Sequence, residues 1–138
     1  MQPPTIAELL NDLVLTQAMD DAWRDSLPND PAQRHEEGGW VYVNTTTGAT
    51  TVQRAPAGRR AMLHLNAPPI VADSVVVATF HTHPNPSAEG WQPGPSAADT
   101  DSAWILGVPC FIRADDGIHS TGPDSRRGGT LGGPGFPP

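Results

Sequence analysis

Two histidines, a serine and an aspartate stand at spacings that suit a catalytic metal ion. His81 and His83 are two residues apart, and Ser96 and Asp99 follow after a stretch rich in proline and glycine. On a strand, residues two apart face the same side about 7 Å from one another, so both imidazoles can reach one ion. Two imidazoles and a carboxylate leave the fourth tetrahedral position of zinc to water, as in catalytic sites. A His-x-His pair alone could equally be two unrelated polar residues, so Asp99 carries much of this interpretation.

Ser96 and Asp99 also have a purely structural interpretation. Ser-x-x-Asp resembles a capping box, in which each side chain bonds a backbone N–H group at the start of a helix. If a helix begins at Ser96, Asp99 lies in its first turn on a side that can face inward, and Asp101 points about 200° away. The capping role and a catalytic role can coexist for Ser96.

The segments around these residues predict how they are positioned. Residues 74–81 form a continuous apolar run, which is typical of a central strand buried on both faces. Prolines and glycines indicate a loop over residues 85–95, and residues 96–106 predict a helix that ends at Gly107. The two histidines are therefore expected at the end of a buried strand, where a ligand can enter.

The remaining segments predict the rest of a sheet. We expect a helix over residues 6–27, a hairpin of residues 40–43 and 49–54, a short edge strand at residues 62–65, and a second hairpin of residues 109–113 and 118–120. This order predicts an α/β fold with a mixed β-sheet flanked by helices.

Further upstream, Glu36-Glu37-Gly38-Gly39-Trp40-Val41 supplies an acid before an early strand. Together with His81-Thr82-His83 and Ser96-x-x-Asp99, it resembles the signature of the JAMM (MPN-plus, JAB-domain) zinc metalloproteases of bacterial type. The resemblance covers roughly residues 33–122 and implies a JAMM/MPN-like, cytidine-deaminase-like single domain. The spacer between His83 and Ser96 is longer than is usual in that family. The additional residues, in 85–95, are either a lid or substrate-contacting rim, or a passive surface loop.

The resemblance implies a role for each matching residue. His81, His83 and Asp99 would hold Zn²⁺, Glu36 would be the general base, and Ser96 would donate a hydrogen bond to the oxyanion. Glu37 adjoins the proposed base, but strand alternation turns neighbouring residues to opposite faces, so only one of the two acids can reach the ion. The spacing of the family's motif selects the first.

The resemblance also implies an activity. The expected function is that of a zinc peptidase or isopeptidase that cuts after the C-terminal glycines of a ubiquitin-like protein. Two alternatives remain, a metallopeptidase effector domain of a polymorphic toxin system and a non-catalytic MPN-type scaffold. A zinc nucleobase deaminase is excluded, because it requires His-x-Glu and Pro-Cys-x-x-Cys: no glutamate follows His81 at the required place, and Pro109-Cys110 is followed by Phe111-Ile112-Arg113.

Size and composition set broader limits. The 138 residues suit one domain, expected over residues 1–122, followed by a flexible Gly/Pro-rich tail over 123–138. A net charge of −7 argues against a nucleic-acid partner. No membrane span or signal peptide is evident, and the single cysteine suits a reducing compartment, so we expect a cytoplasmic protein. The absence of lysine reflects either genome composition or avoidance of lysine-directed conjugation.

Several other residues have ordinary structural interpretations. We expect His35, His64 and His119 to be surface or satisfied polar residues, and Cys110 to be a small buried side chain. Arg126-Arg127-Gly128-Gly129 resembles the end of a ubiquitin-like protein, but a flexible tail is the simpler interpretation.

Overall fold

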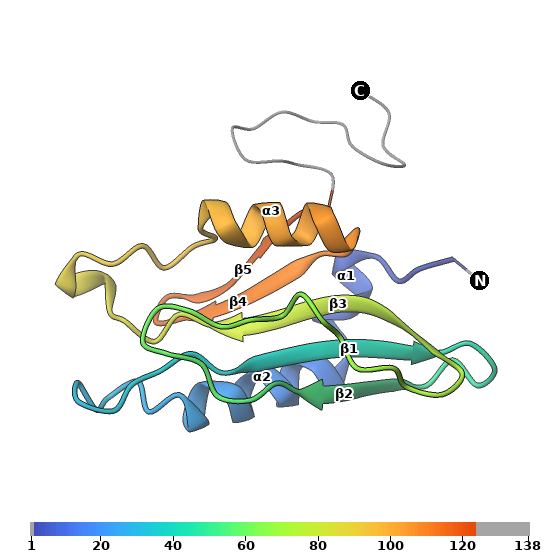
Figure 1. Ribbon diagram of the computed structural model, residues 1–138, viewed down its shortest axis with the longest axis horizontal. Coiled ribbons are helices and arrows are strands. Elements are labelled where there is room, and N and C mark those ends of the chain that lie inside the picture. Colours follow the sequence, from blue (N-terminus) through green and yellow to red (C-terminus); the bar gives the residue numbers. More distant parts are fainter. Residues whose placement is uncertain (1, 124–138) are drawn as a thin grey trace.

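The computed structural model describes residues 2–123 and has an α/β fold built on one five-stranded mixed sheet (Figure 1). The strand order is β2-β1-β3-β4-β5. The elements are α1 (Ile6–Leu10), α2 (Leu13–Asp25), β1 (Gly38–Asn44), β2 (Thr50–Arg54), β3 (Ser74–Thr82), the 3-10 turn η1 (Ser87–Glu89), α3 (Ala97–Leu106), β4 (Cys110–Ala114) and β5 (Gly117–Thr121).

Strand pairing explains why the sheet is mixed. Antiparallel pairs join β1 to β2, β1 to β3 and β4 to β5, and the pair of β3 with β4 is parallel. Parallel neighbours need a crossover connection, and α3 lies within it. The carboxyl end of β3 and the start of α3 are thus linked by residues 83–96, which contain the predicted loop.

The N-terminal helix differs from its prediction over residues 6–27. The chain forms two helices, because Asp12 ends the first and caps the second by accepting a hydrogen bond from the Val14 N–H at 2.9 Å. The apolar stripe runs across this break, so periodicity alone gave one continuous helix. Residues 62–65 also form no strand; this segment has only an isolated bridge between Arg59 and Met62.

Both faces of the central strands are covered. In Figure 1, α1 and α2 lie behind the sheet, and the loop between β2 and β3 crosses in front of it. The larger core joins the two helices to the sheet and includes Leu15, Met19, Val41, Phe80 and Phe111. On the opposite face, a smaller cluster contains Trp40, Tyr42, Ala55 and Leu65, and another under α3 contains Ala103, Cys110 and Ile112.

Two expectations concern the C-terminal tail and the absence of a membrane span. The tail over residues 124–138 lies outside the described residues. Pro123 is described, and Gly122 packs so closely on α3 that a Cβ atom at this glycine would lie 2.5 Å from the Ala103 Cβ. Within residues 2–123, no helix has the length and apolarity that crossing a membrane requires.

Candidate metal centre

The end of β3 directs alternate side chains to opposite faces of the sheet. His81 and His83 face α3, whereas Thr82 faces α2, where its hydroxyl bonds the hydroxyl of Ser26. Backbone hydrogen bonds fix this end on both sides, from the Thr82 N–H to the Glu37 carbonyl and from the His83 N–H to the Arg113 carbonyl, each 2.9 Å long. The two histidines therefore hold their predicted common orientation on a rigid part of the sheet.

The first turn of α3 brings Asp99 against both imidazoles. The Nε2 atoms of His81 and His83 are 3.1 Å apart, and each lies 3.2 Å from one Asp99 carboxylate oxygen. At a tetrahedral angle, two ligand atoms about 2.0–2.1 Å from zinc lie about 3.3–3.4 Å apart. Each nitrogen–oxygen contact is close to that length, and the two imidazoles contact different oxygens of the carboxylate. The donor types, two imidazoles and a carboxylate, fit zinc.

Asp99 and Ser96 also form the predicted capping box. The Ser96 Oγ accepts a hydrogen bond from the Asp99 N–H at 3.1 Å, and the Asp99 carboxylate accepts one from the Ser96 N–H at 2.9 Å. The structural role and the location beside the histidines therefore coexist. The cap fixes the carboxylate that contacts the imidazoles.

The outer nitrogen of each imidazole has a partner of its own. His83 Nδ1 donates to the Pro93 carbonyl oxygen at 3.3 Å, and His81 Nδ1 lies 3.5 Å from the Cys110 Sγ. A carbonyl can only accept, so His83 Nδ1 carries a proton, and in a neutral ring the lone pair that a metal would bind is then on Nε2. Sequence reasoning did not find either partner, because both come from other parts of the chain.

Glu36 approaches the same centre from the chain segment just before β1. Its backbone N–H donates to the Arg59 carbonyl at 2.8 Å, and its own carbonyl accepts from the Gly58 N–H at 2.8 Å. One carboxylate oxygen of Glu36 and one ring nitrogen each of His81 and His83 lie within 4.8 Å of one another. The segment comes close because Gly38 has no side chain: a Cβ atom there would lie 2.2 Å from the Phe80 carbonyl oxygen.

Two sets of three residues could therefore hold an ion, the histidines with Asp99 or the histidines with Glu36. The Asp99 contacts of 3.2 Å match a tetrahedral edge. The separations that include Glu36 are within 4.8 Å, so the geometry supports this set as well. The spacing of the metalloprotease motif favours Asp99 as the third ligand.

Burial and neighbouring charges perturb the ionisation of these groups. Burial raises the pKa of Glu36 to about 7, and the nearby histidines only partly oppose this rise. Burial would also raise the pKa of Asp99, but its hydrogen bonds with His81 and His83 outweigh burial and hold that pKa well below the usual value. For His81, burial lowers the pKa, but Cys110 and Asp99 together raise it well above 6.5. Without a metal, Asp99 is thus ionised and shares protons with the imidazoles.

Glu37 faces the other side of the sheet, as strand alternation predicts. Its carboxylate accepts a 2.7 Å hydrogen bond from the Arg54 guanidinium and contacts the His35 ring. Its backbone N–H donates to the Thr82 hydroxyl at 3.0 Å. Glu37 is therefore fully engaged in an ion-pair network on the α2 side and does not face the two metal-binding histidines.

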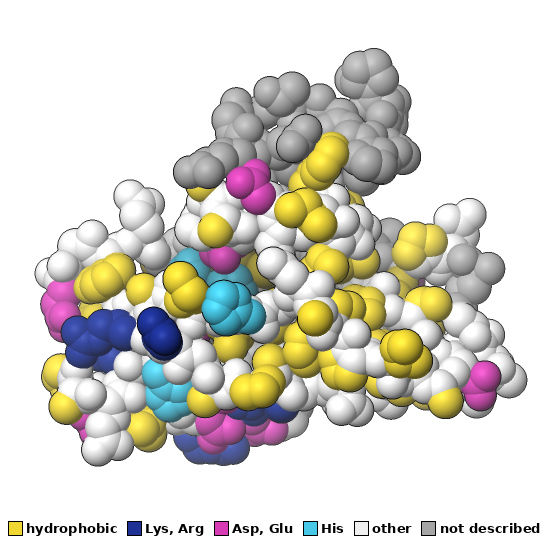
Figure 2. All heavy atoms as spheres, viewed as in Figure 1, with side chains coloured by type: hydrophobic (Ala, Val, Ile, Leu, Met, Phe, Trp, Pro, Cys, Tyr) yellow, Lys and Arg dark blue, Asp and Glu magenta, His cyan; other side chains and the backbone are white. Residues whose placement is uncertain are grey.

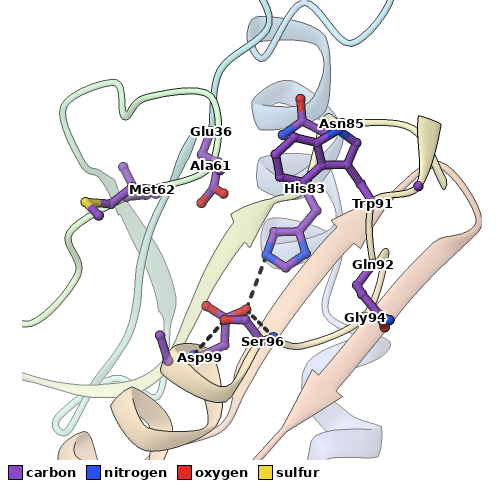
Figure 3. Close-up of a pocket in the computed structure, with 13 residues that line it drawn as sticks. Glu36, Ala61, Met62, His83, Asn85, Trp91, Gln92, Gly94, Ser96 and Asp99 are labelled. Carbon is purple, nitrogen blue, oxygen red and sulfur yellow. Dashed lines mark hydrogen bonds and ion pairs between the residues drawn. The ribbon is translucent and has the colours of Figure 1, made fainter.

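A cavity of about 390 Å³ opens onto the metal centre. Glu36, His83, Ser96 and Asp99 contribute polar groups to its lining, as do the amides of Asn85 and Gln92. In Figure 3, Glu36 and Met62 lie on one side of His83, and Trp91 and Gln92 lie on the other. The other lining residues are Ala61, Leu63, Asn85, Gly90, Gly94 and Ala98. The site is therefore open to a ligand between two apolar walls.

One wall is the segment 85–95, whose role the sequence left open. It is anchored at η1, where the Ser87 backbone N–H and hydroxyl donate to the Asp115 carboxylate. Glu89 accepts hydrogen bonds from Arg34 at 3.2 and 3.3 Å, and the Arg34 side chain is only 4 % exposed. The insert is therefore a built wall of the cavity and not a loop detached from the site.

The opposite wall, in the loop between β2 and β3, carries positive charge. Arg59 and Arg60 are exposed directly before Ala61 and Met62, which line the cavity. Figure 2 shows arginine side chains gathered at the left end of the viewed face, where this loop turns. This positive charge is local, since the whole chain has a net charge of −7.

The remaining candidate residues have structural environments. Cys110 is buried, as expected, although its sulfur also contacts His81. His119 contacts Asp116 at 2.7 Å, His35 contacts Glu37, and His64 is exposed. Arg34 and Asn85 were missed by sequence reasoning, because neither belongs to a motif.

Comparisons with known proteins identified no relative of this chain. No model of a protein family matches the chain, and searches of curated proteins and of solved structures found no match either.

Proposed function

We propose that this protein is a zinc-dependent peptidase or isopeptidase of the JAMM type, which hydrolyses an amide bond in a protein substrate. The observation that carries the proposal is the convergence of His81, His83 and Asp99 at 3.1–3.2 Å on one wall of an open cavity. The acid Glu36, which has no arginine partner, lies beside them. A closed structural zinc site would have no such cavity and no such acid.

The donor set fits zinc, which would be held by His81, His83 and Asp99. When bound, zinc lowers the pKa of its water to about 7 and polarises a carbonyl oxygen. Glu36 is poised for proton transfer near neutral pH, because burial raises its pKa to about 7. It would accept a proton from the attacking water and later deliver it to the leaving amine.

Ser96 would stabilise the oxyanion. Its Oγ accepts the Asp99 N–H, so the hydroxyl proton remains available to donate into the cavity that Ser96 lines. One such donor is typically worth 10²- to 10³-fold in rate. Ser96 would thus both cap α3 and take part in the reaction.

The proposed substrate is the C-terminal tail of a ubiquitin-like protein, joined to a further residue by a peptide or isopeptide bond. The cavity lies between Trp91 and Met62, which suits an extended segment with small side chains next to the bond that is cut. The apolar walls would exclude water from the reacting groups. The proposed setting is the cytoplasm, with no nucleic-acid partner.

The experiment measures metal and cleavage together. Purified protein should contain about one zinc per chain and should cleave fusions of ubiquitin-like proteins after their terminal glycines, with the cut site read by mass spectrometry. A chelator should abolish cleavage and added zinc should restore it. His83→Ala and Asp99→Ala should lose zinc, whereas Asn29→Ala, in an exposed turn, serves as the control. A full zinc content in either ligand variant would refute the ligand set, and zinc without cleavage of any fusion would favour a binding scaffold.

A further inference from the structure

Two buried side-chain atoms among residues 2–123 have no hydrogen-bond partner. They are the Nε atom of Arg34 and the Oδ1 atom of Asn85. Leaving a buried polar atom unpaired costs about 1–3 kcal/mol, so such atoms are rare and call for an explanation. Both residues belong to the insert or to the chain that anchors it.

The two atoms differ in what they can reach. Arg34 does not line the cavity, and its Nη1 already donates to both oxygens of the Glu89 carboxylate, so its role is to anchor the insert. Asn85 does line the cavity and is only 6 % exposed. Of the two atoms, only the Asn85 oxygen belongs to a residue that lines the cavity and could contact a bound substrate.

The Asn85 amide is held in one orientation. Its Nδ2 donates to the Arg60 carbonyl oxygen at 2.9 Å, which links the insert to the opposite wall. The donor side of the amide is therefore used, and the acceptor side is not. A carboxamide oxygen with no partner is an acceptor for a neutral N–H or O–H group.

Trp91 lies on the same insert as Asn85 and lines the same cavity. In Figure 3, Trp91 and Asn85 are both drawn at the end of the cavity away from Asp99. Trp91 is 42 % exposed and follows Gly90, whose φ of 91° belongs to the left-handed region. The indole is thus partly exposed, and the insert that carries it is held by the contacts of Ser87 and Glu89.

We propose that Asn85 is a specificity-determining residue, whose Oδ1 accepts a backbone N–H group of an extended peptide substrate that passes between Trp91 and Met62. The inference rests on the proposed function, because it names how that site would read its substrate. A peptide backbone offers the donor that the oxygen lacks, and the apolar walls suit the rest of the segment. The contact would fix the register of the chain two residues from the ligand His83.

The test pairs a change in the protein with a change in the peptide. The protein is zinc-loaded Glu36→Gln, which should bind without turnover, and calorimetry measures its affinity for an acetylated, amidated pentapeptide ending in two glycines. In a series of analogues, one backbone N–H at a time is replaced by an ester oxygen. One analogue should bind about ten-fold more weakly, as expected for one lost hydrogen bond. With Asn85→Ala added, the parent peptide should bind as weakly as that analogue, and the ester should cost nothing more.

Two further variants separate this contact from a folding defect. Asn85→Asp keeps an acceptor and should retain the sensitivity to the ester, and Asn29→Ala is a matched control in an exposed turn. Zinc content and melting temperature show that each variant is folded. Equal peptide affinity with and without the Asn85 side chain, or an equal ester effect in both proteins, would overturn the inference and assign the oxygen to a bound water. Failure of the peptide to bind the parent protein would also overturn it.

The outcome is distinguishable from failure of the proposed function. If fusions are cleaved but Asn85 shows no coupling to any backbone N–H, the inference fails and the peptidase stands. If the coupling is present but no fusion is cleaved, the peptide subsite stands and the catalytic proposal fails.

Discussion

Glu36 and Glu37 are neighbours in the chain and have opposite surroundings. Glu36 faces the cavity, where burial raises its pKa to about 7 and no arginine among residues 2–123 contacts its carboxylate. Glu37 faces α2, where Arg54 and His35 contact its carboxylate. The same residue type at the same depth is thus left poised for proton transfer on one face and neutralised by partners on the other.

The comparison shows that the two faces of the sheet use their polar groups differently. On the α2 side, the Thr82 hydroxyl bonds the Ser26 hydroxyl and accepts the Glu37 N–H, and the Glu37 carboxylate pairs with Arg54. Each of these groups therefore serves stability. On the α3 side, Glu36 and His83 line an open cavity. Perturbed ionisation in such a cavity is typical of functional sites.

The largest expected effect comes from Glu36→Gln in the zinc-loaded protein. Removal of a general base typically costs 10²- to 10⁴-fold in rate, and we expect a loss of that size with an unchanged zinc content. The measurements are the cleavage rate of a ubiquitin-like fusion and elemental analysis. Glu37→Gln is the matched control and should stay within a few-fold of the wild-type rate. The reverse result would exchange the roles of the two acids.

The pH dependence of the metal-free protein distinguishes the two faces next. The pKa of Glu36 is raised from 4.5 to about 7, so the folded state keeps a proton that the unfolded state releases. Stability should therefore fall as pH rises from about 4.5 to 7, by about 3 kcal/mol. Urea unfolding in the presence of a chelator measures this loss.

The Glu36→Gln protein is the control for that pH series. It should lose much less stability over the same range, because it has no carboxyl group to ionise. The raised pKa of His81 adds a further loss only above its ordinary value of 6.5. An identical pH profile in wild type and variant would mean that Glu36 ionises normally.

A smaller effect is expected from Glu37→Gln on stability. The substitution leaves Arg54 and His35 without their shared carboxylate, and we expect unfolding to become easier by about 1–3 kcal/mol. Chemical denaturation measures the change, and cleavage by the same sample should remain. A stable variant with lost activity would place Glu37 in the reaction.

The smallest effect is expected from Thr82→Val. The hydroxyl accepts the Glu37 N–H and bonds Ser26, so its loss should cost about 1–2 kcal/mol of stability. The zinc affinity should not change, because this side chain faces away from the two histidines. Thr51→Val, at an exposed position of β2, should leave stability nearly unchanged. A large drop in zinc affinity would show that the two faces are coupled.

Local patterns predicted most of the elements. The apolar run of β3 and the Ser96 cap of α3 depend on neighbouring residues only, and both are present in the structure. The predictions failed where tertiary contacts compete with local pattern. Asp12 interrupts the N-terminal helix, and Leu65 packs on Trp40 and accepts its indole N–H instead of joining a strand ladder.

The sequence predicted the residues of the candidate site but not the residues that contact them. The motif identified the two histidines, Asp99, Ser96 and Glu36; the structure places all but His81 on the lining of one cavity, and His81 contacts Asp99 behind it. The other contacts could not be predicted, since they join segments far apart in the chain: Pro93 with His83, Cys110 with His81, Arg34 with Glu89.

The sequence by itself determined the short-range geometry: two imidazoles on one face of a strand, and an aspartate held by a serine cap in the first turn of a helix. Spacings of two and three residues are fixed by the backbone geometry of strand and helix. Only the tertiary structure decided that this helix meets those imidazoles, that Glu36 faces the cavity, and that the insert forms a wall with an unpaired asparagine oxygen. Those facts depend on how the sheet, the crossover and the loops pack, which no local pattern encodes.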